Sequence, residues 1–183
     1  MSSGRSNKLT AQIGEYLVCA ELGKRTLIAT PFAGNVPTFD VLATDEFCRT
    51  VPIQVKTTRG DKWPTDARHW LNIQYDESTK TQKNLGRKEI KNPSLIYVFV
   101  AIAPDDKSRD RFFILTKSQL QDVVVKHHCD WMDKHEWKRP RAPESYDCRF
   151  SIPEVQGYEN NWKLISDGLA SSSPVRSLES TDE

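Results

Sequence analysis

The chain has 183 residues, of which 37% are apolar and 28% are charged, a balance typical of one globular domain. The net charge of +1 excludes a protein that coats nucleic acid through bulk charge, but it is compatible with a local basic face. No apolar run approaches the ~20 residues of a membrane span. The four cysteines lack CxxC spacing and no secretory signal is recognisable, so we expect a cytoplasmic protein with reduced thiols and no membrane association.

A helix is predicted over residues 8–22, after a polar segment (1–7) that we expect to be flexible. Gly23 is a natural end for this helix. Its apolar residues recur at helical spacing: Leu9, Ile13, Tyr16, Leu17 and Ala20. Glu15 falls inside a second apolar sector rather than on the polar edge. An acid among small and aliphatic neighbours is a candidate functional residue.

Apolar and alternating stretches predict a series of strands after this helix. They are TLIATPF (26–32), PTFDVLAT (37–44), TVPIQVKTT (50–58), HWLNIQY (69–75), SLIYVFVAIA (94–103) and RFFIL (111–115). The uninterrupted apolar run at 94–103 is typical of a strand that is covered on both faces. Residues 79–93 are polar and basic, and we interpret them as a connection. Together these elements favour an α/β fold with a mixed sheet.

A capping box at residues 116–119 predicts a second helix that continues to about residue 126. The sequence after it has no clean period. We therefore divide one domain, 8–166, into a core (8–126) and a C-terminal extension (127–166). Tyr158, Trp162, Leu164 and Ile165 would pack this extension back on the core. The Ser-rich tail at 167–183 is expected to be disordered.

The two strands at 37–44 and 50–58 form a predicted hairpin with an unusual polar face. Because side chains alternate along a strand, Gln54 and Lys56 share one face and can meet Asp40 across the turn. One interpretation is a solvated Asp–Lys pair that contributes at most about 1 kcal/mol. Glu15 and the apolar flanking strands favour a functional site, because buried charges are costly unless a ligand or ion completes the group.

The segments GEYLVCAEL, FDVLATD and IQVKTT resemble the PD-(D/E)XK nuclease superfamily, which includes many restriction enzymes and Holliday junction resolvases. The resemblance extends over residues 8–125 by order of elements. It implies a restriction-endonuclease-like fold with an αβββαβ core: a mixed β-sheet flanked by helices. The matching motif consists of Glu15, Asp40 and the Gln54-x-Lys56 pair.

The resemblance also implies a role for each motif residue. Asp40 would be the metal-binding acid, and Glu15 the acid of the first helix that assists the metal. Gln54 stands where the family more often has Glu or Asp, and its carbonyl oxygen would assist together with the Val55 backbone carbonyl. The expected metal is Mg²⁺, with Mn²⁺ as a substitute, because these ions prefer oxygen ligands. Lys56 would act on the attacking water or on transition-state charge.

Residues after the motif are candidates for phosphate contacts, although a basic loop is as often only a solvated surface. The candidates are Thr57, Thr58, Arg59, Lys62, Lys83, Arg87 and Lys88. A zinc site in the extension is a weaker interpretation, since the spacing of its residues matches no regular zinc pattern. Those residues are His127, His128, Cys129, His135 and Cys148.

The leading prediction is a Mg²⁺-dependent DNA endonuclease, and cleavage of both strands of a duplex would favour a homodimer. Gln54 supports an alternative, a catalytically inactive relative that binds nucleic acid or a protein. A third possibility is an interaction module that depends on residues 127–165.

Overall fold

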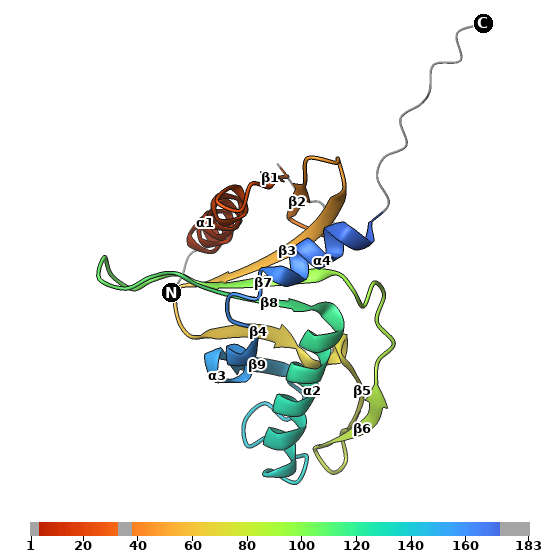
Figure 1. Ribbon diagram of the computed structural model, residues 1–183. Coiled ribbons are helices and arrows are strands. Elements are labelled where there is room, and N and C mark those ends of the chain that lie inside the picture. The colour runs from red at the N-terminus through yellow and green to blue at the C-terminus, as the bar shows by residue number, and fades with distance from the viewer. Residues whose placement is uncertain (1–3, 33–37, 173–183) are drawn as a thin grey trace, which may run out of the picture.

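A mixed five-stranded sheet forms the centre of the protein, whose computed structural model describes residues 4–32 and 38–172 (Figure 1). The strand order is β1-β2-β3-β7-β8. Strands β3 and β7 are parallel, whereas the other neighbouring pairs are antiparallel. The bounds are β1 (Ile28–Pro31), β2 (Val41–Thr44), β3 (Thr50–Thr58), β7 (Ile96–Ala101) and β8 (Arg111–Thr116). The buried inner strand β7 is the apolar run that the sequence predicts to be covered on both faces.

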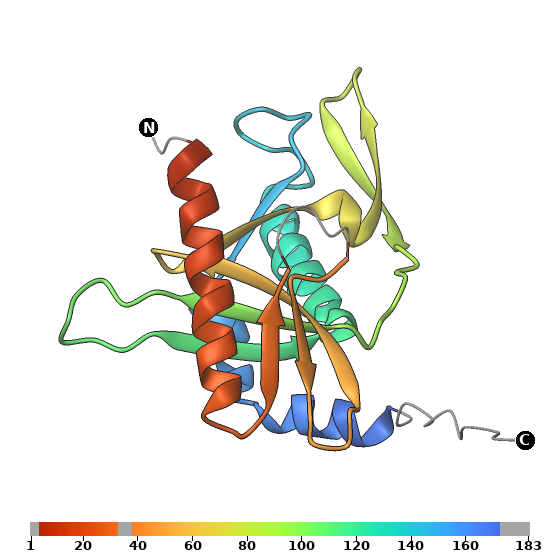
Figure 2. The same ribbon diagram turned by 90° about the horizontal axis from the view of Figure 1, so that it is seen from above.

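Helices α1 (Gly4–Gly23) and α4 (Lys163–Ser171) cover one face of this sheet (Figures 1 and 2). Their contact with the sheet is aliphatic. It consists chiefly of Val18, Leu22, Val51, Ile53, Val55, Val98, Ile114, Ile165 and Leu169, all at most 8% exposed. Burial of these side chains removes apolar surface from water, which is the main favourable term in folding. Val51, Ile53 and Val55 point to this face, so Gln54 and Lys56 point to the other.

The opposite face is covered over β7 and β8 by a second layer. This layer contains α2 (Lys117–Asp133) and the antiparallel pair β4 (Lys62–Asp66) and β9 (Asp147–Ser151), followed by α3 (Ile152–Val155) and η2 (Gln156–Tyr158). Its contact with the sheet is aromatic: Trp63 packs on Phe99, Phe113 and Phe150 with ring centroids 5.3–5.8 Å apart. The extension after residue 126 thus belongs to the main core.

The crossover from β3 to β7 differs from the αβββαβ order that the sequence predicts. Instead of an α-helix it contains β4, the short 3-10 helix η1 (Ala67–His69) and a hairpin of β5 (Leu71–Asp76) and β6 (Thr81–Arg87). The prediction that residues 79–93 form only a connection is wrong, because Thr81–Arg87 pairs with β5. The strand lacks apolar alternation because it lies on an exposed hairpin, and only Gln82 of this strand is buried.

Three predicted boundaries also change. Helix α1 begins at Gly4, so residues 4–7 are helical rather than loose. Helix α2 begins at the predicted capping box of Thr116 and Gln119 but continues to Asp133. Helix α4 includes residues 167–171, which were expected in the disordered tail, because Leu169 packs into the core. Residues 1–3 and 173–183 lie outside the described part of the chain.

No helix among the described residues is long and apolar enough to cross a bilayer.

Candidate active site

Asp40 lies where the β2–β3 ladder ends, one residue before β2. Its backbone N–H donates to the carbonyl of Ile53 (2.9 Å), the residue that faces Val41 in the β2–β3 register. Its carboxylate oxygen Oδ2 accepts hydrogen bonds from the Val55 backbone N–H (2.8 Å) and from the Gln54 side-chain amide. The predicted proximity of Asp40 and Gln54 is therefore confirmed.

The Val55 carbonyl faces the same edge as Asp40. In a strand, the N–H and C=O of one residue point to the same neighbour, and the Val55 N–H points to the Asp40 carboxylate. Lys56 follows on the face of Gln54, and its side chain is exposed. Three consecutive positions of β3 thus supply an amide, a backbone carbonyl and an ammonium group beside the carboxylate of Asp40.

Helix α1 brings Glu15 to this group through a close contact at Gly14. A Cβ atom on Gly14 would lie 1.8 Å from the Thr57 Oγ1 atom, so only glycine allows α1 to approach β3 this closely. Gly14 is buried, and the neighbouring Glu15 is half-buried. Sequence reasoning did not assign a role to Gly14, although a glycine in the middle of a helix next to a candidate acid was a usable signal.

Electrostatics place Glu15 near both Asp40 and Lys56. The pKa of Glu15 is raised from its ordinary value of 4.5, first by burial and then by the negative charge of Asp40, while Lys56 acts in the opposite direction. The pKa of Tyr97 is also raised, by burial and by Asp40. Tyr97 is the partner of Gln54 in the β3–β7 register, so it lies beside the site on the neighbouring strand β7.

Oxygen ligands for a hard cation are available in this group. They are the carboxylates of Asp40 and Glu15, the amide oxygen of Gln54 and the carbonyl oxygen of Val55. Within the described residues, the second carboxylate oxygen of Asp40 accepts no hydrogen bond. Mg²⁺ commonly uses one or two carboxylates and completes its shell with water and substrate phosphate. The residues present therefore fit Mg²⁺.

The zinc interpretation of the extension finds no support in the described residues, which contain no group of three or more His, Cys, Asp or Glu side chains that could hold a metal. His127 pairs with Glu154 (2.6 Å). His128 is buried, and burial together with the charge of Arg139 lowers its pKa to about 4. Burial raises the pKa of the Cys148 thiol to about 12, so this cysteine is an unreactive side chain of the core.

The predicted phosphate contacts next to β3 have different environments. The Thr57 hydroxyl oxygen is buried against Gly14, so it is not accessible to a phosphate in this arrangement. The Thr58 hydroxyl accepts a hydrogen bond from the Gly60 backbone (3.1 Å). Arg59 donates to Thr10 of α1 (3.3 Å), and Lys62 is exposed at the start of β4. Arg59 and Lys62 therefore remain suitable for contacting a ligand at the end of β3.

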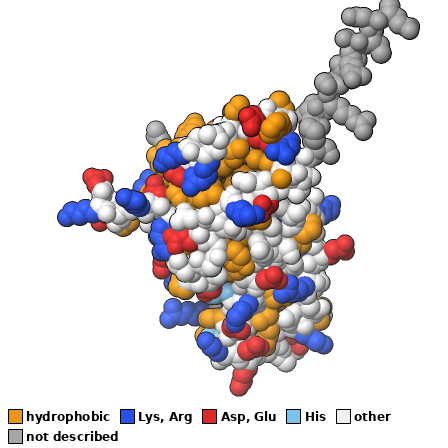
Figure 3. Space-filling model, viewed as in Figure 1, with side chains coloured by type: hydrophobic (Ala, Val, Ile, Leu, Met, Phe, Trp, Pro, Cys, Tyr) orange, Lys and Arg blue, Asp and Glu red, His pale blue; other side chains and the backbone are white. Residues whose placement is uncertain are grey.

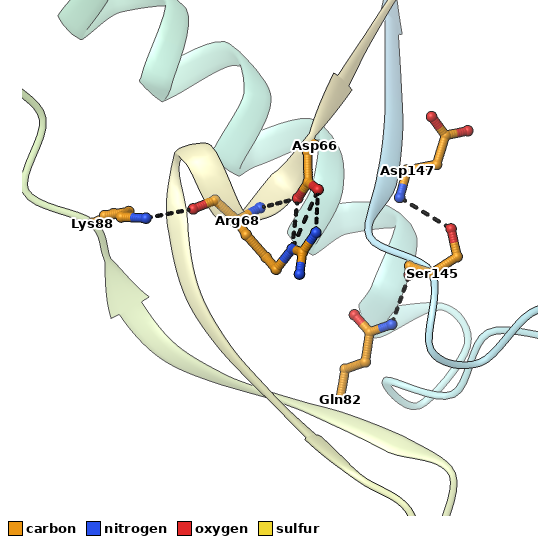
Figure 4. A network of polar contacts seen from close by, with 6 residues as sticks. All are labelled: Asp66, Arg68, Gln82, Lys88, Ser145 and Asp147. Atoms are coloured by element: carbon orange, nitrogen blue, oxygen red, sulfur yellow. Dashed lines mark hydrogen bonds and ion pairs between the residues drawn. The ribbon is translucent and has the colours of Figure 1, made fainter.

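Lys83, Arg87 and Lys88 belong to the β5–β6 hairpin and its exit, which project from the body away from α1 (Figures 1 and 2). Arg87 pairs with Asp122, and the Lys88 ammonium donates to the Arg68 carbonyl (3.1 Å). Figure 4 shows this contact beside the Asp66–Arg68 ion pair. It also shows Gln82 bound to the Ser145 carbonyl, which anchors the hairpin to the body. Two of these three cations thus already have partners within the chain.

Charges of both signs are interspersed on the face shown in Figure 3, and hydrophobic side chains are exposed mainly around α1 and α4. Among the large apolar side chains of the described residues, Ile28 on the edge strand β1 has the largest exposed fraction, 72%. This face has no continuous basic patch.

The fold was compared with solved structures. A bacterial homing endonuclease, I-Ssp6803I, aligns with a TM-score of 0.52 and 13% sequence identity, over 91% of this chain and 97% of that protein. A Holliday junction resolvase, Hjc from Archaeoglobus fulgidus, aligns with a TM-score of 0.43 and 11% identity, over 85% of this chain and 95% of that one.

No protein-family model matches the sequence, and no curated protein matches it. The likeness therefore concerns the fold. Its basis is the central mixed sheet with helices on its faces, shared with the homing endonuclease over nearly the whole length of both chains. The chain thus has a restriction-endonuclease-like fold, a mixed sheet flanked by helices, as the sequence analysis predicts.

Proposed function

We propose that the protein is a metal-dependent endonuclease that hydrolyses phosphodiester bonds in DNA. The observation that carries this proposal is the proximity of two half-buried acids, Asp40 just before β2 and Glu15 on α1. Asp40 is held by Gln54 and Val55, and burial together with the charge of Asp40 raises the pKa of Glu15. A divalent cation that binds both carboxylates would remove the electrostatic repulsion between them.

Mg²⁺, when bound, stabilises negative charge on a phosphoryl oxygen and lowers the pKa of a water molecule. The chain's own groups then have separate tasks. Asp40 and Glu15 would hold the cation, assisted by the oxygens of Gln54 and Val55. The hydrogen bond from the Val55 N–H fixes one oxygen of Asp40 and leaves the other available to a cation.

Lys56 is the residue that acts on the reacting atoms. Its ammonium group is exposed two positions after Gln54, on the same face of β3. There it can orient the attacking water and neutralise charge that develops on the phosphate as the water oxygen bonds to phosphorus and the phosphorus–oxygen bond of the DNA strand breaks. The proposal also assigns phosphate contacts to the cations nearest the end of β3, Arg59 and Lys62.

A cleavage assay tests the proposal. Plasmid and oligonucleotide DNA are incubated with the protein and Mg²⁺, Mn²⁺ or a chelator. We expect cleavage only with metal, and we expect Asp40→Asn to abolish it while the protein stays folded. The matched control is Asp167→Asn on α4, which covers the other face of the sheet. Equal activity of Asp40→Asn and Asp167→Asn would contradict the assignment.

A catalytically inactive, DNA-binding relative is the second candidate, and one observation favours it. The Gln54 amide donates to Asp40, so a neutral group occupies a position where a carboxylate would add a negative charge for the metal. Calorimetric titration with Mg²⁺ and Mn²⁺ distinguishes the two candidates. No heat of metal binding, together with DNA affinity that falls steeply with salt, would favour the inactive relative.

Cutting both strands of a duplex is simplest for a protein with two active sites. We therefore propose a homodimer as the active form on duplex DNA. Analytical ultracentrifugation with and without DNA measures this directly, and a monomer under both conditions that still cuts both strands in one binding event would contradict it.

A further inference from the structure

A pocket of about 300 Å³ opens beside Lys56, on the face of the sheet that carries Gln54. It lies between the open part of β3 and the aromatic layer formed by β4 and β9. Its lining consists of Lys56, Thr57, Trp63, Pro64, Thr65, His69, Trp70, Tyr97, Phe99, Leu120 and Phe150. The pocket and the candidate active site therefore share Lys56 as a common wall.

The floor of the pocket is aromatic and rigid. Trp63, Phe99 and Phe150 are at most 3% exposed, and their rings pack on one another at 5.2–5.8 Å. The indole N–H of Trp63 donates to the Lys56 carbonyl (3.1 Å), and that of Trp70 donates to the Thr65 hydroxyl (2.9 Å). Both indole donors are satisfied, so these buried rings form a rigid apolar base, and the accessible ring faces of the pocket belong to His69 and Tyr97.

The rim of the pocket is accessible and polar. Lys56, Pro64 and His69 are exposed, and Tyr97 is half-buried. No hydrogen bond within the described residues involves the His69 ring or the Tyr97 hydroxyl. None of the lining residues is acidic, whereas Lys56 and His69 can carry positive charge. The pocket thus combines ring surface with polar groups that do not repel a phosphate.

We propose that this pocket accepts the base of an unpaired nucleotide next to the phosphate that is cleaved. The proposal rests on the proposed function and specifies its substrate class: nucleic acid with at least one unstacked base, rather than continuous duplex. Every base presents a ring face, so the accessible rings of His69 and Tyr97 above the aromatic floor can stack on bases with little sequence preference. A base inside a duplex is stacked and must leave the helix to enter such a pocket, which favours substrates where it is already unpaired.

The geometry links the pocket to the chemistry through one backbone group. The Trp63 indole N–H donates to the backbone carbonyl of Lys56, the residue whose ammonium group is assigned to the phosphate under the proposed function. A base seated on this floor would bring its own phosphate group to Lys56. The base of the β5–β6 hairpin adjoins the same region, because the Lys88 backbone N–H donates to the Trp70 carbonyl (3.0 Å).

Three DNA molecules of one sequence test this assignment. The first is a fully paired duplex, the second carries one bulged nucleotide, and the third carries the same bulge without its base. Binding is measured by fluorescence anisotropy in a chelator, so that no cleavage occurs. We expect the bulged base to bind about tenfold more tightly than the abasic bulge, as stacking on an aromatic surface provides. Equal affinity for the two bulges would overturn the proposal.

Two histidine variants locate the effect. His69→Ala removes the exposed ring at the rim and should reduce the ratio of the two bulge affinities toward one. The matched control is His135→Ala, a histidine on the other side of the aromatic layer that stacks on Trp131 and does not line the pocket. Its ratio should equal that of the wild type. An unchanged ratio in His69→Ala, or an equal loss in both variants, would overturn the assignment to this pocket.

The binding and cleavage measurements test the two proposals independently of each other. If metal-dependent cleavage occurs without any dependence on the unpaired base, the pocket proposal is wrong and the nuclease proposal stands. If the base-dependent binding appears but no metal supports cleavage, the pocket binds nucleic acid and the nuclease proposal is wrong.

Discussion

The part of the sheet face over β7 and β8 and the part over β3 have opposite chemistry. Over β7 and β8, aromatic rings from β4, β9 and the sheet itself exclude water from the sheet. This layer does not extend over β3, where the side chains on the same face of the sheet include Gln54 and Lys56. The side chains on the other face of β3 are aliphatic and are covered by α1 and α4. The polar side chains thus occur where the covering layer ends, which is what a binding site on a stable scaffold requires.

Removing a ring from the aromatic layer should have the largest effect on stability. Trp63→Ala leaves a cavity among Phe99, Phe113 and Phe150, and we expect a loss of about 3–5 kcal/mol in the free energy of unfolding. Lys56→Ala on the open part of the same face should change stability by less than about 0.5 kcal/mol. Urea denaturation measures both, and similar losses in the two variants would contradict the division between covered and open regions.

A substitution at Gly14 tests whether the packing of α1 on β3 positions Glu15 at the candidate site. Gly14→Ala puts a Cβ against the Thr57 hydroxyl, so α1 must move, and we expect a loss of about 1–3 kcal/mol with reduced metal affinity because Glu15 moves with the helix. Gly23 is a control on the same helix, since a Cβ there has no neighbour within 4 Å. Gly23→Ala should be neutral or slightly stabilising. Denaturation and metal titration check both variants, and two equal outcomes would mean that the contact with Thr57 does not position Glu15.

Gln54→Glu separates stability from metal binding at the open site. The substitution replaces the amide that donates to Asp40 with a second carboxylate, so the metal-free protein should lose about 1–3 kcal/mol. The added charge should strengthen Mg²⁺ binding, measured by calorimetry. If the variant binds metal no better than the wild type, Gln54 is not a ligand position.

Glu15→Gln should have the smallest effect, and this effect depends on pH. The pKa of Glu15 is raised above 4.5 in the folded protein, so its protonated form favours folding below pH 4.5 and this contribution is lost as pH rises through the raised pKa. The metal-free variant should therefore be more stable than the wild type at pH 7 and equal to it below pH 4.5. Unfolding in a chelator at both pH values tests this, and a variant that is less stable at pH 7 would contradict the repulsion between Glu15 and Asp40.

The sequence was sufficient to predict the hairpin because local rules determine it. Strict alternation at Val51, Ile53 and Val55 and a short turn set the register, and this register brings Asp40 to Gln54. Strand β7 was also predictable, from its continuous apolar run. Both features depend on residues close together in the sequence.

The missed elements depend on contacts between distant residues. Strand β6 is exposed and held by Gln82, whose amide bonds to the carbonyls of Pro143 and Ser145, about 60 residues away. The continuation of α2 was hidden by polar residue types at 127–130, although Leu120, Val124, His128 and Met132 recur every four residues and are buried. The pocket beside Lys56 could not be predicted, because the crossover strand β4 brings Trp63 back to the sheet.

The most direct test of the central claim is the single-turnover cleavage rate of Lys56→Ala with Mg²⁺ or Mn²⁺, compared with the wild type at saturating protein. The matched control is Lys163→Ala, an exposed lysine on α4 over the other face of the sheet. We predict metal-dependent cleavage by the wild type and by Lys163→Ala, and a rate about 10²–10³-fold lower for Lys56→Ala. A wild-type protein without metal-dependent cleavage, or equal rates in all three proteins, would contradict the claim that the open part of β3 is a nuclease active site.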